Sequence, residues 1–188
     1  MKVGILALQG AFAVHEEMLQ GLGADTVQVR TPQDLGLVDA LVMPGGESTT
    51  MSHLLTTSEL FDPIAERINS AMPVFGTCAG MILLAKSIAS GRPDQRFYGA
   101  IDIDVERNAY GRQVESFETE LNVEGLKSPF HAMFIRAPQV VRLGADVEVL
   151  STHEDKVVLA RQGSVMVASF HPELTSDNRI HSLFLQEA

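Results

Sequence analysis

The first half of the chain alternates short aliphatic runs with segments of helical periodicity. The runs end at glycine, proline or polar residues and predict strands at 3–8, 26–30, 40–43 and 73–76. The segments between them repeat apolar residues every three or four positions and predict helices at 12–22, 48–55, 60–68 and 79–88. Short strands that alternate with helices indicate a mostly parallel central sheet with helices on both faces.

From residue 100 onward, short apolar runs separated by turn residues replace this alternation. They predict strands at 101–105, 115–123, 133–136, 147–151, 157–160 and 165–169. We expect these strands to form an antiparallel or mixed extension of the same sheet, and a last helix to span 176–185. Without a repeat or linker, residues 1–188 are expected to form one α/β domain, a three-layer sandwich.

Composition excludes several classes of function. Fourteen basic and 24 acidic residues give a formal charge of −10, which argues against nucleic-acid binding because phosphate contacts require a basic face. No apolar stretch approaches the ~20 residues needed to span a bilayer. A single cysteine cannot form an internal disulfide, so we expect a soluble protein of the reducing cytoplasm.

That cysteine, Cys78, lies in the pattern G-x-C-x-G between a predicted strand and a predicted helix. A sharp strand-to-helix turn needs Gly76 and Gly80 to avoid clashes and exposes the central side chain at the sheet edge. The helix N-terminus would favour the thiolate, as a nucleophile requires. The structural alternative is a buried cysteine that only fills the core.

A general base and its orienting group follow the last predicted strand in the segment SFHPE. His171 and Glu173 are two residues apart and would point to the same side of an extended backbone, with Pro172 restricting the chain between them. The alternative is an exposed polar turn. Five further histidines are taken as surface or core residues: His15, His53, His131, His153 and His181.

The segment MPGGES supplies a third element of a catalytic centre. Its glycines leave backbone amides accessible, and the amides of Gly46 and Ala79 are candidates for binding an oxyanion. A simple strand-to-helix turn is the alternative. Three such segments at the ends of three strands of one sheet favour a catalytic site over three unrelated turns.

These segments resemble the class I, triad-type glutamine amidotransferases. The blocks LALQGAFAVHEE, MPGGESTTM, FGTCAGMILLAK, VERNAYGRQVESFE, FIRAP and SFHPELT are similar, in that order, to the glutaminase subunits of pyridoxal 5′-phosphate synthase. The resemblance runs from about residue 3 to 185, with residues 90–98 matching least well. It implies a flavodoxin-like fold.

The resemblance also implies a reaction, hydrolysis of L-glutamine to L-glutamate and ammonia, and a role for individual residues. Cys78 would be the nucleophile, His171 the acid–base and Glu173 its orienting partner. Gln9 would act on the arrangement of the oxyanion loop. Substrate contacts would come from Gly46, Glu47, Ser48, Arg107, Ile135 and Arg136. Spacing alone does not distinguish Arg107 from Arg112 or Arg142, and either Arg107 or Arg136 could bind the substrate carboxylate.

The implied partner is a (β/α)₈-barrel synthase subunit that uses the ammonia to make pyridoxal 5′-phosphate, with twelve copies of each subunit. No cofactor or metal is expected, because the sequence has no cluster of His and Cys ligands. Two alternatives remain: a cysteine hydrolase of another class on a similar sheet, which need not carry PGGES or the His-x-Glu pair, and a non-catalytic binding module.

Overall fold

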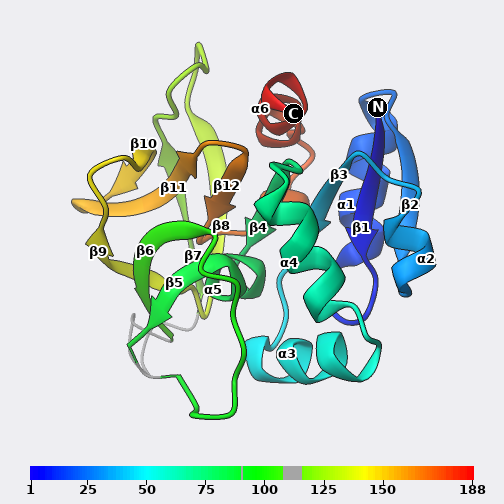
Figure 1. Cartoon of the computed structure of the whole chain (residues 1–188). Coiled ribbons are helices and arrows are strands. Elements are labelled where there is room, and N and C mark those ends of the chain that lie inside the picture. The colour runs from blue at the N-terminus through cyan, green and yellow to red at the C-terminus, as the bar shows by residue number, and fades with distance from the viewer. Residues whose placement is uncertain (90, 108–115) are drawn as a thin grey trace.

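The computed structural model describes residues 1–89, 91–107 and 116–188 and is built around one large sheet (Figure 1). Seven of the described strands form it in the order β10-β11-β12-β4-β3-β1-β2. Their bounds are β1 (Lys2–Leu6), β2 (Asp25–Val29), β3 (Ala40–Met43), β4 (Val74–Thr77), β10 (Glu148–His153), β11 (Lys156–Gln162) and β12 (Val165–Ala168). The five strands from β12 to β2 are parallel, and β11 and β10 add an antiparallel edge.

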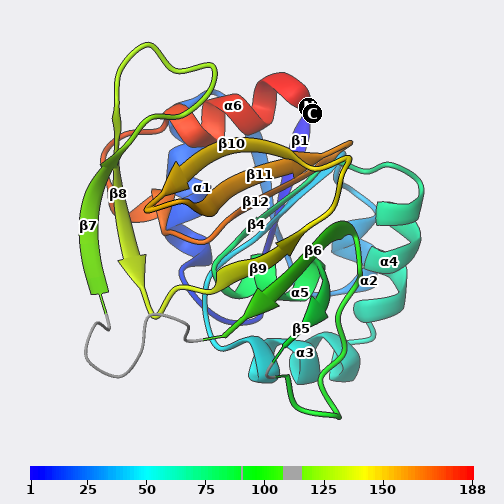
Figure 2. The ribbon, with the colours of Figure 1, turned by 90° about the vertical axis from the view of Figure 1, so that its left-hand side faces the viewer.

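Helices cover both faces of this sheet, which confirms the predicted α/β sandwich. They are α1 (Phe12–Gly21), α2 (Pro32–Leu35), α3 (Ser48–Thr57), α4 (Phe61–Asn69), α5 (Ala79–Leu84) and α6 (Arg179–Glu187), with a 3₁₀ turn η1 (Pro172–Leu174). Figure 2 shows α1 and α6 on one side of the sheet and α3 and α4 on the other.

The alternation of side chains along each strand explains why the main sheet has an apolar cluster on each of its two faces. Successive side chains of a strand point to opposite faces. In β3, Leu41 and Met43 pack into the apolar cluster beneath α3 and α4, whereas Ala40 and Val42 pack into the cluster beneath α1 and α6.

The remaining strands correct two predictions. Residues 79–88 were expected to be one helix, but α5 ends at Leu84 and β5 (Ala85–Ile88) pairs with β6 (Ile101–Glu106). The six residues of α5 are all buried, so their apolarity reflects burial on every side and does not mark one face of a longer helix, whereas Lys86 of β5 is exposed.

The second half of the chain is also not one extension of the main sheet. Among the described strands of this half, β10, β11 and β12 join the main sheet. In contrast, β5, β6 and β9 (Gln139–Leu143) form a separate sheet, and β7 (Ser116–Leu121) pairs with β8 (Phe130–Ile135). The sequence did not predict β9 or α2, and the last helix begins at Arg179 rather than residue 176. Residue 115, the expected start of a strand, lies outside the described residues.

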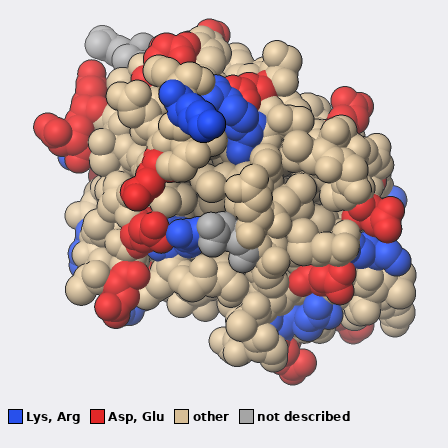
Figure 3. Space-filling view, turned by 90° about the horizontal axis from the view of Figure 1, so that it is seen from above, with Lys and Arg blue, Asp and Glu red and all other residues tan. Residues whose placement is uncertain are grey.

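The carboxyl edge of the parallel strands brings the candidate residues together. The segments that follow β1, β3, β4 and β12 carry Gln9, Gly46, Cys78 and His171. Because β4 lies between β3 and β12, Cys78 is flanked by the segments that carry Gly46 and His171. The opposite side of the molecule, seen in Figure 3, shows acidic and basic side chains interspersed rather than gathered into a basic face.

Candidate active site

Cys78 occupies a strained turn between β4 and α5. Its backbone has φ 49° and ψ −100°, a region that residues with a side chain rarely adopt. The Cys78 amide donates to the Ala168 carbonyl at 2.8 Å, which ties the turn to β12. A Cβ on Gly80 would overlap the Met43 carbonyl, and one on Gly76 would lie 2.7 Å from the Gly80 carbonyl carbon. The two glycines are therefore required by close packing around the turn, as the G-x-C-x-G pattern indicated.

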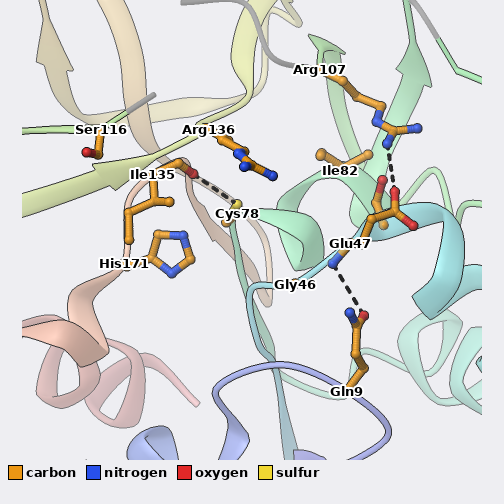
Figure 4. Close-up of a pocket in the computed structure, with 11 residues that line it drawn as sticks. Gln9, Gly46, Glu47, Cys78, Ile82, Arg107, Ser116, Ile135, Arg136 and His171 are labelled. Atoms are coloured by element: carbon orange, nitrogen blue, oxygen red, sulfur yellow. Dashed lines mark hydrogen bonds and ion pairs between the residues drawn. The ribbon is translucent and has the colours of Figure 1, made fainter. Parts of the chain in front are cut away.

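His171 and Glu173 form a buried pair beside this thiol. Nδ1 of His171 lies 2.8 Å from Oε1 of Glu173, and the His171 amide donates to the Met133 carbonyl at 2.8 Å, which fixes the start of η1 against β8. The imidazole faces Cys78 in Figure 4. Glu173 is 1% exposed, so its carboxylate contacts His171 and does not line the cavity.

The electrostatics of the pair favour an imidazolium. Burial opposes the charge on His171, but hydrogen bonds with Cys78 and Glu173 and their charges outweigh it and raise the pKa of His171 to about 10. Burial also disfavours the Glu173 carboxylate, yet the hydrogen bond from His171 and the nearby His15 hold the pKa of Glu173 below its usual value.

Cys78 and His171 open onto a cavity of about 540 Å³. The predicted residues Gln9, Gly46, Glu47, Ser48, Arg107, Ile135 and Arg136 also line it, together with Ile82 and Ser116, which were not predicted. The Ser48 hydroxyl is buried and has no hydrogen-bond partner among the described residues. It is therefore available to a ligand.

Two backbone segments could bind a developing oxyanion. Gly45 must be glycine, because a Cβ there would lie 2.5 Å from Cε1 of His171. The peptide bond between Gly46 and Glu47 is held by Gln9, because the Glu47 amide donates to Oε1 of Gln9 at 3.3 Å (Figure 4). Ala79 is the first residue of α5, so its amide has no partner within the helix.

Glu47 and Arg107 form a network at the cavity rim. The Glu47 carboxylate caps α3 by accepting from the Thr49 amide at 3.1 Å and the Thr50 amide at 2.7 Å. Burial opposes this charge, but those amides and hydroxyls lower the pKa of Glu47 to about 2. Arg107 donates to Glu47 Oε1 at 2.8 Å and to the Thr49 hydroxyl at 2.9 Å. The negative charge of Glu47 is thus already paired with Arg107, and the sequence did not predict this ion pair.

The structure separates the competing arginines. Arg142 lies on β9, is bound by Asp102 and Asp104, and does not line the cavity. Arg112 lies outside the described residues. Among the described residues, Arg107 and Arg136 are therefore the arginines that line the cavity.

Two of the histidines taken as surface or core residues lie behind the site. His15 and His181 are fully buried, and Nε2 of His15 lies 3.3 Å from Oε2 of Glu173. The contact between His15 and Glu173 joins residues from opposite ends of the chain, so no local pattern in the sequence indicates it. The described residues contain no group of three His, Cys, Asp or Glu side chains arranged to hold a metal, and none of the described helices is long and apolar enough to cross a membrane.

A strained cysteine turn, a buried His–Glu pair and a glycine-rich loop thus meet at one edge of a mostly parallel sheet, an arrangement that suits a glutamine amidotransferase. The chain belongs to the SNO glutamine amidotransferase family, whose model matches residues 5–188. It is 56% identical over 188 residues to the protein named pyridoxal 5′-phosphate synthase subunit PdxT of Herpetosiphon aurantiacus, covering 98% of this chain and 99% of the relative. The identically named protein of Mycobacteroides abscessus is 54% identical over 183 residues, covering 97% and 95%.

Solved structures agree with this family. A crystal structure of a glutamine amidotransferase superposes with a TM-score of 0.92 at 51% identity, covering 98% of this chain and 97% of the other. A second glutamine amidotransferase, from Thermotoga maritima, has a TM-score of 0.64 at 15% identity, covering 100% and 83%, and shows the shared fold alone. The resemblance stated from the sequence is confirmed.

Proposed function

We propose that this chain is a glutaminase that hydrolyses L-glutamine to L-glutamate and ammonia and supplies the ammonia for pyridoxal 5′-phosphate synthesis. The observation that carries the proposal is the arrangement of Cys78 in its strained turn, facing His171, which is backed by Glu173 at the wall of one cavity. Family membership adds the amide substrate, and the names of the relatives add the pathway.

The reaction proceeds through a thioester. The Cys78 thiolate attacks the side-chain amide carbon of glutamine, and the amides of Gly46 and Ala79 bind the oxyanion that forms. The protonated His171 gives its proton to the departing nitrogen, so the C–N bond breaks and ammonia leaves. Water then adds its oxygen to the thioester while His171 accepts a proton, and glutamate and the thiolate are released.

The first half of the reaction requires His171 to be protonated, because it must give a proton to the leaving nitrogen. A raised pKa of His171 keeps the proton available for the leaving group at neutral pH. Glu173 stabilises that positive charge and orients the ring through Nδ1, so that the other ring nitrogen serves Cys78. We therefore assign the triad Cys78, His171 and Glu173.

The substrate backbone would lie between the glycine loop and β8. Gly46, Glu47, Ser48 and Ile135 line one continuous cavity with Arg107 and Arg136, which supports all six as substrate contacts. The substrate carboxylate requires a cation. Arg136 lines the cavity directly after Ile135, so we assign the carboxylate to Arg136 and a supporting role at the rim to Arg107, which pairs with Glu47.

The ammonia requires an acceptor close by, because in water it would be protonated and lost. We propose that the partner is a (β/α)₈-barrel synthase subunit, in a complex of twelve copies of each, with residues 1–188 acting as one amidotransferase domain in the reducing cytoplasm. The relatives are named as subunits of a pyridoxal 5′-phosphate synthase, which supports a synthase partner. Gln9 would act as a gate, since its side chain holds the peptide next to Gly46.

The test is release of ammonia and glutamate from glutamine by the purified chain, with and without the synthase subunit. The proposal expects glutamine hydrolysis in the presence of the synthase. Hydrolysis of esters or peptides but not of glutamine would instead favour a cysteine hydrolase of another class. Absence of every hydrolytic activity in the complex would favour a non-catalytic module.

A further inference from the structure

A line of buried polar side chains continues from Glu173 into the protein, away from the cavity. His15 projects from α1 and His181 from α6, and both are fully buried. Oε2 of Glu173 lies 3.3 Å from Nε2 of His15, and Nδ1 of His15 lies 2.8 Å from Nε2 of His181. The Thr77 hydroxyl, next to Cys78 in the chain, lies 3.3 Å from the same Nε2 of His15.

The second carboxylate oxygen of Glu173, Oε2, faces this line of polar side chains and not His171. Oε1 is satisfied by His171, but Oε2 is buried and accepts no hydrogen bond of full geometry from a described residue. Nε2 of His15 lies 3.3 Å from this oxygen, as far as it lies from the hydroxyl of Thr77, with which it forms a hydrogen bond. A carboxylate with one buried, unsatisfied oxygen would be costly, so this donor matters to the ionised form.

Chemistry restricts which nitrogens carry protons. A carboxylate oxygen can only accept, so His15 faces Glu173 favourably only when Nε2 is protonated. Its Nδ1 is then an acceptor, and His181 must donate from Nε2. The bare Nδ1 of His181 is then a lone pair, and it has no partner among the described residues. The opposite arrangement would leave a buried N–H donor on that atom and turn a lone pair of His15 toward the carboxylate.

We propose that His15 is a positioning residue of the triad, which holds Glu173 ionised and oriented through Oε2, and that His181 fixes the tautomer of His15. The proposal rests on the proposed function. It extends the contact line to Cys78–His171–Glu173–His15–His181, which joins residues from both ends of the chain.

The two histidines hold their protons rather than relay them. Burial lowers the pKa of His15 against the attraction of Glu173, and burial with the neighbouring His15 lowers the pKa of His181 to about 3. Both are therefore neutral donors at neutral pH. The titratable groups that act on them in the described part of the chain are Glu173 and His171, together with each other.

Paired substitutions at His15 separate positioning from packing. His15→Phe fills the space without a donor, whereas His15→Gln retains an amide N–H near the position of Nε2. In the complex with the synthase subunit, we expect His15→Phe to lower kcat about tenfold, with KM for glutamine within about twofold because His15 does not line the cavity. His15→Gln should recover most of the loss, and the exposed control His53→Gln should match the unsubstituted chain.

The pH profile gives a readout that packing would not move. Without the donor, the carboxylate of Glu173 is less stable, so the acidic limb of kcat/KM should move to higher pH in His15→Phe and return in His15→Gln. Equal losses in both variants, or full activity of His15→Phe, would overturn the proposal.

Long-range ¹H–¹⁵N spectra of the unsubstituted chain test the tautomers directly and do not depend on whether a variant folds. We expect His15 and His181 both to be protonated at Nε2 and bare at Nδ1 between about pH 6 and 8. Protonation of His15 at Nδ1 would overturn the proposal. If the unsubstituted complex released no ammonia, the proposed function would fail, while these spectra would still decide how Glu173 is held.

Discussion

The imidazole of His171 lies directly against the α-carbon of Gly45, where a Cβ would stand 2.5 Å from Cε1 and 3.0 Å from Nδ1. Gly45 belongs to the loop after β3, and His171 follows β12. The position of the His171 ring, the proposed acid–base, thus depends partly on the absence of a side chain in the loop that follows β3.

Substitution of Gly45 by alanine should therefore displace His171. The added methyl group would push the ring away from Glu173 or from Cys78, and a displacement of about 1 Å can reduce a rate about 100-fold. We expect a loss of that size in kcat for glutamine hydrolysis, measured in the complex with the synthase subunit. Gly21→Ala is the control, because a Cβ there meets no atom within 4 Å; equal activity of the two variants would contradict the account.

Replacing Glu173 by glutamine should change the pH dependence as well as the rate. The Glu173 carboxylate helps to raise the pKa of His171 to about 10, so its loss lowers that pKa. The imidazolium would then be lost at lower pH, and the alkaline limb of the kcat/KM profile should shift downward. We expect kcat to fall about 10²–10⁴-fold. An unchanged alkaline limb would show that Glu173 does not act on His171.

Arg136 and Arg142 lie on neighbouring stretches of the chain but should behave differently. Arg136 lines the cavity, whereas Arg142 pairs with Asp102 and Asp104 outside it. Arg136→Ala should raise KM for glutamine at least about tenfold, since a charge-assisted contact to the substrate carboxylate is lost. Arg142→Ala should leave KM unchanged. Steady-state kinetics with varied glutamine check both, and a normal KM in Arg136→Ala would remove it as the substrate cation.

His181 should make the protein sensitive to acid. Its pKa is lowered to about 3 in the folded chain but returns to about 6.5 on unfolding. The unfolded chain therefore binds the proton first, and stability is lost as the pH falls from 6.5 toward 3. The shift corresponds to about 3 kcal/mol at pH 4.

His181→Gln keeps a donor toward His15 and removes this titration. Urea unfolding at pH 7, 5.5 and 4 should show a smaller loss of stability on acidification than in the unsubstituted chain. His53→Gln, at an exposed position, should retain the full loss. The same decline in His181→Gln as in His53→Gln would mean that His181 is not a buried neutral group.

The residues that were predictable from the sequence lie at the ends of parallel strands. Cys78, Gly46 and His171 each follow a short apolar run, and topology alone brings such ends to one edge of a sheet. The capping pair Thr31 and Asp34, which begins α2, was a readable local signal that was missed.

Other features depend on contacts that have no local pattern. The strand β9 has only one buried residue, Val140, so it lacks a clear alternation. Arg107 pairs with Glu47 across 60 residues, and His15 meets His181 across 166. His15 is a buried residue of α1, and only the fold shows which carboxylate it faces.

Substitution of Cys78 by alanine, assayed in the complex with the synthase subunit, tests the central claim most directly. Product formation is measured once with glutamine and once with an ammonium salt as the nitrogen source. We predict that Cys78→Ala abolishes synthesis from glutamine and leaves synthesis from ammonium intact, because only the thiol that releases ammonia is lost. Continued synthesis from glutamine by this variant would contradict the assignment of Cys78 as the nucleophile.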